Sequence, residues 1–372
     1  MEKYYSGVLQ DILCYNGNLL RQLIDYFGSS ARLLSAAKSE LLQGKFCREE
    51  KASRLVAEFK NVRDRAGRLQ EYCTKQGIKL CSIDEPEYPE LLKEIHNPPQ
   101  VIFYRGKLAD GPRIAMVGAR KATAYGKAVA EALARTMAAR GFVIVSGAAI
   151  GIDSEAHKGA LSTGVTEAVL GCGVDVAYPP SNRKLLAQIA EKGAVISEFL
   201  PETPPRTSNF PTRNRIISGL AMGTVVVEAA EKSGSLITAE QAISEGRDIF
   251  AVPGSIFSVS SRGCNKLLQQ GAKLVLNASD IMNEYDVKLQ KNHYIEKNDE
   301  KNKTRVIMTE AEARIFKLLS VDNPLSVDEI IYRLHGRDTA NVAFILLQLE
   351  LRGLVRADDL HCYVRVIKGD IL

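Results

Sequence analysis

The sequence predicts an α/β protein built on an extended, doubly wound parallel sheet, and two observations carry this prediction. Two apolar runs in succession, residues 114–117 and 142–145, each end in a glycine-containing loop that leads into a helical pattern. Short apolar runs of this kind are typical of buried parallel strands. Further strand patterns then alternate with helical stretches as far as residue 276, which indicates a sheet covered by helices on both faces.

Strands and helices follow one another regularly through this core. After the first two strands we expect strands at 167–171, 194–197, 224–228, 248–252 and 273–276. The helices between them are expected at 153–162, 181–192, 213–221 and 235–245. Upstream, two apolar segments read as strands that extend the sheet before the parallel core begins, at 78–83 and 101–104.

We expect four parts in this chain of 372 residues, which exceeds the usual length of one domain. Residues 1–75 predict an N-terminal helical domain, ending in a charged helix at 49–75, that either binds nucleic acid or only covers the core. Residues 76–284 form the core, and 285–306, rich in Lys, Asn, Glu and Asp, is a predicted linker. Residues 307–372 predict three helices and a hairpin, the pattern of a winged-helix domain. Because its third helix carries few basic residues, protein contact or capping is favoured there over DNA reading.

Composition excludes several classes of protein. A net charge of +5 permits a polyanionic partner without demanding one. The seven cysteines include no C-x-x-C pair, which argues against a zinc site and a disulfide framework and is typical of a reducing cytosol. The N-terminus is polar, and no apolar run approaches the roughly 20 residues of a membrane helix. We therefore expect a cytoplasmic protein with no metal and no membrane association.

The loop after the first core strand is a candidate ligand site. Its glycines lack the spacing of the dinucleotide-binding fingerprint, and the chain has no P-loop motif. The loop carries Arg120, which can hold a phosphate with two hydrogen bonds, beside a helix N-terminus with free N–H groups. Tyr125 could stack on a base. The alternative is a loop of a nucleotide-binding fold that binds nothing.

Other loops after strands carry further candidates. Asp153 is expected to cap the next helix, and His157 follows one turn later, so an Asp–His pair is possible. Because no nucleophile or metal set accompanies them, a structural hydrogen bond is favoured over chemistry. Polar or cationic residues also follow the second strand and begin a later helix, namely Ser146, Gly147, Asn182, Arg183 and Lys184.

The densest basic stretch places arginines around an aromatic residue: Arg206, Phe210, Arg213 and Arg215. This interleaving suits single-stranded nucleic acid, whose bases stack while its phosphates are held electrostatically. Salt bridges for the arginines and core packing for Phe210 remain open alternatives. Glu228 ends a strand, and a structural role is favoured for it. Because the carboxyl ends of parallel strands share one edge, we expect all these loops to converge.

Several of these motifs in order resemble the bacterial DNA-processing protein A (DprA/Smf) family. The resemblance spans residues 80–277 and includes Gly-Ala-Arg at 118–120, Ser-Gly-Ala-Ala-Ile-Gly-Ile-Asp at 146–153, Asn-Phe-Pro-Thr-Arg-Asn-Arg at 209–215 and Ser-Gly-Ser-Leu-Ile-Thr at 233–238. It implies an extended Rossmann-like core that binds single-stranded DNA, usually as a homodimer, between a helical domain similar to SAM or helix-hairpin-helix modules and a winged helix. Family members protect incoming DNA in natural transformation and load the RecA recombinase onto it. The sequence departs from the family pattern at Val165 and Glu167.

The resemblance implies a non-enzymatic protein without cofactor, metal or catalytic residues, whose partners are single-stranded DNA and RecA. It places Arg120 on the family's phosphate-gripping arginine, and Arg183 or Lys184 on a basic position of the pocket rim. The residues predicted to bind DNA are Gly118, Arg120, Thr123, Tyr125, Gly126, Lys127, Ser146, Gly147, Asn182, Arg183, Lys184, Phe210, Arg213, Asn214 and Arg215.

Two other functions are weighed against this one. Residues 223–228 are similar to the G-T-x-x-E loop of phosphoribohydrolases that cleave nucleoside monophosphates. The Pro-Gly-Gly that precedes that loop is absent here, and the glutamate lies one position late. The other alternative is a DNA-reading regulator led by the winged helix.

Overall fold

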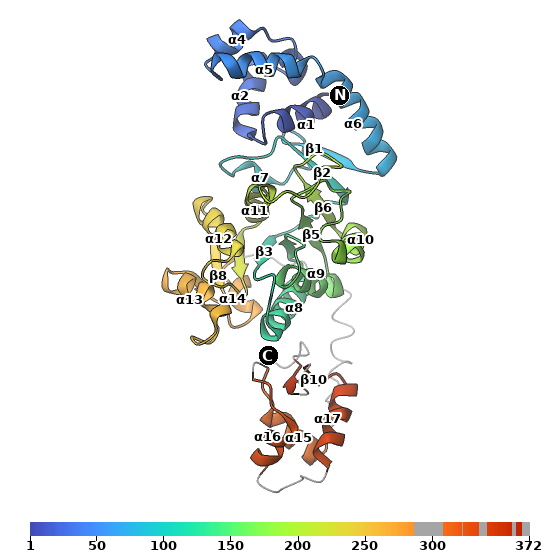
Figure 1. The fold of residues 1–372 in the computed structure, drawn as a ribbon, viewed down its shortest axis with the longest axis vertical. Coiled ribbons are helices and arrows are strands. Elements are labelled where there is room, and N and C mark those ends of the chain that lie inside the picture. Colours follow the sequence, from blue (N-terminus) through green and yellow to red (C-terminus); the bar gives the residue numbers. More distant parts are fainter. Residues whose placement is uncertain (286–307, 322, 335–340, 359–361, 367–372) are drawn as a thin grey trace.

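A computed structural model describes residues 1–285, 308–321, 323–334, 341–358 and 362–366. Three parts follow one another along the long axis of Figure 1: the N-terminal helices, the sheet with its covering helices, and the C-terminal helices. The predicted linker at 285–306 lies outside the described residues except for its first residue.

The first part of the chain is helical, as the sequence predicts. Its helices are α1 (Glu2–Ile12), α2 (Gly17–Phe27), α3 (Ser30–Leu33), α4 (Lys38–Gln43), α5 (Glu49–Phe59) and α6 (Val62–Gln76). They enclose a hydrophobic core of their own, which includes Leu9, Leu20 and Phe59. The single helix expected at 49–75 is wrong, because the chain breaks between α5 and α6 at Lys60 and Asn61.

Nine strands form one sheet in the order β1-β2-β6-β5-β4-β3-β7-β8-β9. They are β1 (Lys79–Ser82), β2 (Val101–Gly106), β3 (Arg113–Val117), β4 (Val143–Ser146), β5 (Thr166–Val169), β6 (Ala194–Ser197), β7 (Gly223–Val226), β8 (Asp248–Ala251) and β9 (Lys273–Leu274). Strands β3 to β9 pair in parallel, whereas β1 and β2 are antiparallel and lie beside β6. The predicted parallel core and its two added strands are therefore confirmed.

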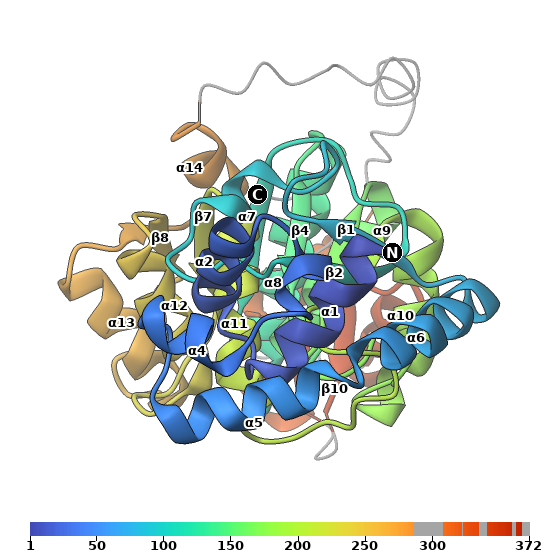
Figure 2. The ribbon, with the colours of Figure 1, turned by 90° about the horizontal axis from the view of Figure 1, so that it is seen from above.

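The N-terminal helices are anchored to the edge of this sheet (Figure 2). The side-chain amide of Gln10 donates to the carbonyl oxygens of Val101 and Glu198, and its oxygen accepts from the N–H of Val101. Tyr72 of α6 donates to Asp175 Oδ2 over 2.8 Å. These buried and partly buried bonds fix the helical unit to the core.

Helices cover both faces of the sheet. One face carries α8 (Ala124–Ala139), α9 (Ile152–Thr163) and α10 (Arg183–Lys192). The other carries α7 (Glu90–Lys93), α11 (Asn209–Leu220), α12 (Gly234–Ser244) and α13 (Arg262–Gln269). Shorter elements complete the core, namely η1 (Pro180–Asn182), η2 (Val259–Ser261) and α14 (Ala278–Met282).

The order of the strands reverses at β3. The chain passes from β3 through β4 and β5 to β6 on one side, and then returns to β7 on the other side of β3. At such a reversal in an open parallel sheet, the two loops diverge and leave a crevice in which ligands bind. Here the two loops are residues 118–123 and 227–233.

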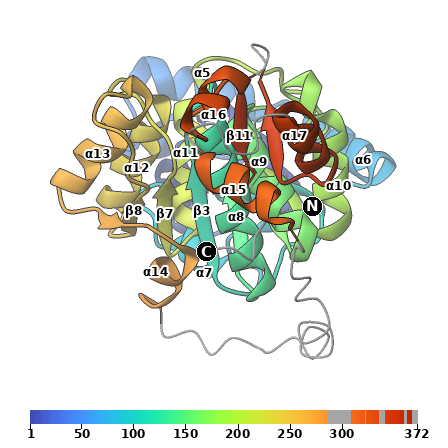
Figure 3. The same cartoon turned by 90° about the horizontal axis from the view of Figure 1, so that it is seen from below.

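In the part of the C-terminal unit that the structure describes lie three helices and a two-stranded antiparallel sheet (Figure 3): α15 (Glu310–Leu318), α16 (Val327–Arg333), α17 (Val342–Leu351), β10 (Val355–Ala357) and β11 (Tyr363–Arg365). Thr309 and Ser326 begin α15 and α16 with capping boxes. The unit encloses a separate core that includes Ile315, Leu346 and Val355. This arrangement is the predicted winged-helix pattern.

The described residues hold no candidate for a membrane span, a disulfide bond or a metal site. None of their helices has both the length and the apolar character needed to cross a bilayer. They include all seven cysteines, and no disulfide bond joins any two of these. No three of their His, Cys, Asp or Glu side chains are grouped so as to hold a metal ion.

Candidate nucleic-acid interface

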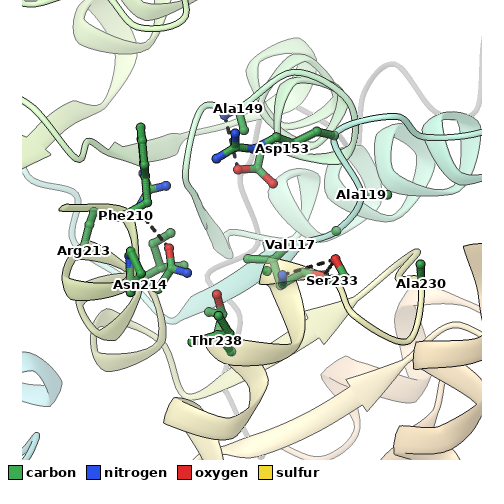
Figure 4. A pocket seen from close by; sticks show the side chains of 17 residues that line it. Val117, Ala119, Ala149, Asp153, Phe210, Arg213, Asn214, Ala230, Ser233 and Thr238 are labelled. Atoms are coloured by element: carbon green, nitrogen blue, oxygen red, sulfur yellow. Dashed lines mark hydrogen bonds between the residues drawn. The ribbon is translucent and has the colours of Figure 1, made fainter. Parts of the chain in front are cut away.

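A cavity of about 380 Å³ opens where the strand order reverses (Figure 4). The loop after β3, the first turns of α11 and the N-terminus of α12 form its walls. The polar, charged and aromatic groups on these walls include Arg120, Asp153, Phe210, Arg213, Asn214, Ser233, Ser235 and Thr238. The loops after β3, β4 and β7 meet here as the sequence predicts, whereas residues 182–184 do not line this cavity.

Arg120 and Phe210 lie together on the cavity wall. The exposed guanidinium of Arg120 lies over the Phe210 ring, 5.3 Å from its centroid. The ring of Tyr178 lies beside Phe210, with 5.6 Å between the two centroids. A cation held next to aromatic rings in this way suits a ligand that offers both phosphates and planar bases.

Arg213 also lines the cavity, but it is almost fully buried, with 5% of its surface exposed. Its Nη1 donates to the carbonyl oxygens of Gly147 and Val169, and its Nε donates to Asn214 Oδ1 over 3.2 Å. Burial lowers the pKa of Arg213 to about 10. The side chain therefore stays protonated at neutral pH and gives the cavity a fixed positive charge.

Asp153 and His157 have structural roles. Oδ2 of Asp153 accepts hydrogen bonds from the N–H groups of Gly147 and Ala149, so this carboxylate ties back the loop after β4. The expectation that it caps α9 is wrong, because the cap of that helix is Gly151. Burial raises the pKa of Asp153, although the Arg213 guanidinium opposes this shift. His157 Nδ1 lies 2.7 Å from Thr166 Oγ1, so the favoured structural hydrogen bond is made with Thr166 and not with Asp153.

Glu228 accepts hydrogen bonds at the N-terminus of α8 from the protein interior. Its Oε2 accepts from Thr123 N–H over 3.1 Å and from Thr123 Oγ1 over 2.8 Å. The Thr123 hydroxyl in turn accepts from the N–H of Gly126. These donors are therefore already satisfied within the chain, so Thr123 and Gly126 shape the loop. The favoured structural role of Glu228 agrees with this geometry.

The N-terminus of α12 contributes cavity residues that sequence reasoning left out of the site. Ser233, Gly234 and Ser235 lie on the cavity wall, and Ser233 caps the helix by accepting from the N–H of Ser235. A helix N-terminus carries partial positive charge and attracts anions. A signal for these residues was present in the sequence, because a Ser-Gly-Ser segment begins an apolar helix at the same edge of the sheet.

A smaller cavity of about 90 Å³ shares Arg120, Phe210 and Arg213 with the large cavity of about 380 Å³. Gly147 lines the smaller cavity together with apolar side chains, which include Ile150, Leu170 and Tyr178. Ile150 is 47% exposed although it is apolar. This cavity therefore combines the side chains of Arg120 and Arg213 with exposed apolar surface.

The structure separates the predicted DNA-binding residues by position. Those that line one or both cavities are Gly118, Arg120, Gly147, Phe210, Arg213 and Asn214. Lys127, Arg183 and Lys184 are exposed on the first turns of α8 and α10. Ser146 and Asn182 instead bond protein groups: Ser146 donates to the carbonyl oxygen of Met116, and Asn182 donates to that of Ala148 and to Ser154 Oγ.

Two of the predicted residues face away from the cavities. Tyr125 is half-buried, and its hydroxyl donates to the carbonyl oxygen of Pro253 over 3.3 Å. Arg215 is 8% exposed and lies 2.5 Å from Glu198 Oε2. Burial raises the pKa of Glu198 to about 7, although the guanidinium opposes this shift. The alternative considered for this arginine, a salt bridge, is the one that the geometry supports.

Family models match most of the chain. The model described as DNA recombination-mediator protein A matches residues 79–286, and the DprA winged helix domain matches residues 301–359. The chain is 43% identical over 238 residues to DNA processing protein DprA of Bacillus subtilis, which covers 63% of this chain and 80% of that protein. It is 37% identical over 283 residues to Protein Smf of Escherichia coli, which covers 75% of each chain.

Solved structures of DprA proteins are also similar to this chain. The X-ray structure of DprA from Streptococcus pneumoniae superposes with a TM-score of 0.61 at 37% identity, over 73% of this chain and 95% of that one. DprA from Helicobacter pylori superposes with a TM-score of 0.51 at 30% identity, over 55% of this chain and 95% of that one. The resemblance expected from the motifs is confirmed: the chain belongs to the DNA recombination-mediator protein A (DprA/Smf) family.

Proposed function

We propose that this chain binds single-stranded DNA without sequence preference at the large cavity. The observation that carries the proposal is the Arg120–Phe210 pair on the wall that also holds buried Arg213 and the N-terminus of α12. Guanidinium groups and helix N-termini attract phosphates, and an aromatic ring stacks on any base. Contacts of this kind fix the backbone and carry no direct information about sequence.

The relatives support the proposal. The description of the Helicobacter pylori structure states that this DprA binds single-stranded DNA. The relatives from Bacillus subtilis and Streptococcus pneumoniae are named DNA processing proteins. By the same resemblance, the proposed role is to protect incoming DNA in natural transformation and to load RecA onto it, in the cytoplasm and without catalysis.

Exposed cations on the first turns of α8 and α10 extend the proposed path of the strand. Lys127 lies in the first turn of α8, and Arg183 and Lys184 lie in the first turn of α10. Both turns follow loops at the same edge of the sheet as the cavity. Cations at these helix starts can follow a phosphate backbone beyond the nucleotide held at Phe210.

A homodimer is also part of the proposal. Strand β9 ends the sheet, and Leu274 and Leu276 beside this edge are 49% and 66% exposed. An apolar sheet edge of this kind suits a second copy of the same surface. Sedimentation over a range of protein concentrations tests this part, and a monomer at all of them contradicts it.

Arg120→Ala tests the DNA site directly. Each phosphate contact adds about 0.7 to the salt slope of single-strand binding. The variant is expected to bind all sequences more weakly to a similar extent and to lower that slope by about 0.7. Arg120→Lys keeps the charge and is expected to keep the slope. Unchanged affinity of the alanine variant at several salt concentrations overturns the assignment.

A further inference from the structure

We propose that Glu228 is a positioning residue for DNA binding: its buried carboxyl group holds the 118–123 loop in the shape that presents Arg120. This inference rests on the proposed function, because it assigns to Glu228 no contact of its own with DNA. Glu228 is 3% exposed and follows β7. Glu228 is not among the described residues that line the large cavity.

Glu228 holds the loop on both sides of Arg120. Before the arginine, the N–H of Ala119 donates to the main-chain oxygen of Glu228 over 2.7 Å. After it, the N–H and hydroxyl of Thr123 donate to the carboxylate over 3.1 and 2.8 Å. The exposed arginine therefore lies on a short span whose two ends are bonded to the same residue. Its guanidinium then reaches Phe210 from this span.

The glycines of the motif fit the close approach of Glu228. A Cβ on Gly126 would lie 1.9 Å from Glu228 Oε2, and one on Gly118 would lie 2.9 Å from the Glu228 carbonyl oxygen. Both distances are too short for any other residue type without movement of the glutamate or of the loop. Gly126 thus makes room for the glutamate, whereas a Cβ on Gly118, which also lines the large cavity, would lie even closer to Ile152 Cγ1, at 2.6 Å.

A carboxylate is suited to this place because it meets the N-terminus of α8. Anions are favoured at helix N-termini, where N–H groups lack intrahelical partners. In this chain the anion is internal, so the turn is held without a bound phosphate. Arg120 is then the cation of this loop that lines the large cavity and offers its side chain to DNA there. The loop is preorganised, which reduces the ordering cost of binding.

A double-mutant cycle between Glu228 and Arg120 tests the inference. Glu228→Ala is expected to weaken binding of a thymidine oligonucleotide about tenfold, a coupling of ordinary size for residues in one network. In the Arg120→Ala background the same change is expected to cause little further loss. Glu228→Gln keeps an oxygen acceptor for Thr123 and is expected to recover most of the affinity. Thr123→Val removes the hydroxyl partner and provides a second route if Glu228→Ala fails to fold.

Glu167→Gln is the matched control, because Glu167 is also a buried glutamate. It accepts hydrogen bonds from Arg113 Nε and Ala109 N–H over 2.8 Å each, at the amino ends of β3 and β5, away from the cavity. Its DNA affinity is expected to equal that of the wild type.

Three outcomes separate the inference from the proposed function. If Arg120→Ala weakens binding and Glu228→Ala does not, the inference is wrong and the function stands. If the two losses add in the double variant, Glu228 does not act through Arg120, and the inference is again wrong. If Arg120→Ala changes nothing, the proposed function itself fails.

Discussion

Phe210 lies where the proposed phosphate contacts of the arginines adjoin the proposed stacking of a base. Its ring lies 5.3 Å from the Arg120 guanidinium and 5.9 Å from that of Arg213. Stacking of a base on an aromatic side chain contributes about 1–3 kcal/mol. Phe210→Leu is therefore expected to weaken single-strand binding roughly five- to a hundredfold for any sequence, as measured by fluorescence anisotropy. Phe210→Tyr keeps the ring and is expected to bind like the wild type; equal loss in both variants contradicts a stacking role.

His157 predicts a pH dependence of stability. Burial lowers the pKa of this histidine from 6.5 to about 3. Between these values the unfolded chain takes up a proton that the folded chain does not. The contribution to the free energy of unfolding is therefore fully present above pH 6.5 and falls as the pH is lowered, by at most about 1.4 kcal/mol per pH unit.

His157→Asn removes this titration. Its midpoint of thermal unfolding is expected to fall less steeply than that of the wild type between pH 6.5 and pH 4. Neutral pH serves as the internal reference, since both proteins are then uncharged at this position. Parallel curves for the two proteins would show that His157 is not buried in its neutral form.

Among the elements, α12 makes the clearest prediction, because its N-terminus lines the large cavity. A Cβ on Gly234 meets no atom within 4 Å, so a side chain fits there. Gly234→Asp places a carboxylate at a helix N-terminus, which stabilises the helix by about 0.3–1 kcal/mol but repels phosphate. We expect unchanged or higher thermal stability together with weaker single-strand binding. Gly234→Ala is the neutral control, and equal binding by the two variants contradicts a phosphate beside α12.

The elements also show what the sequence could and could not predict. The core strands were predictable because each is a short apolar run that ends in a turn. The break between α5 and α6 was not predictable from periodicity, because the buried residues keep helical spacing straight through it: Ala52, Leu55, Phe59, Val62 and Ala66. Glu228 and Thr123 are 105 residues apart in the sequence, so only the folded sheet brings them together.

The candidate site shows the same limit on one helix. Arg213 and Arg215 belong to one basic motif, and from this motif both were predicted to bind DNA. Residues two positions apart on an α-helix point in directions that differ by about 200°. Arg213 therefore lines the cavity, whereas Arg215 is buried against Glu198. Composition could not separate them, but their spacing on a helix could have done so.

For the whole molecule, the separate cores predict separable roles. The C-terminal unit has a hydrophobic core of its own, and the sheet and its helices have others. Deletion of residues 305–372 is therefore expected to leave a folded protein that binds single-stranded DNA with nearly wild-type affinity. Anisotropy titrations of the truncated and complete chains measure this. Loss of all DNA binding would instead favour a regulator that reads DNA through its winged helix.

The central claim is that the carboxyl edge of the sheet binds bare polynucleotide strands. The most direct test is a titration of single- and double-stranded oligonucleotides of the same sequence at two salt concentrations. The single strand is expected to bind more tightly than the duplex at both salt concentrations, with a similar affinity for unrelated sequences and a marked loss of affinity at the higher salt. Equal or tighter binding of the duplex at both salt concentrations would contradict it.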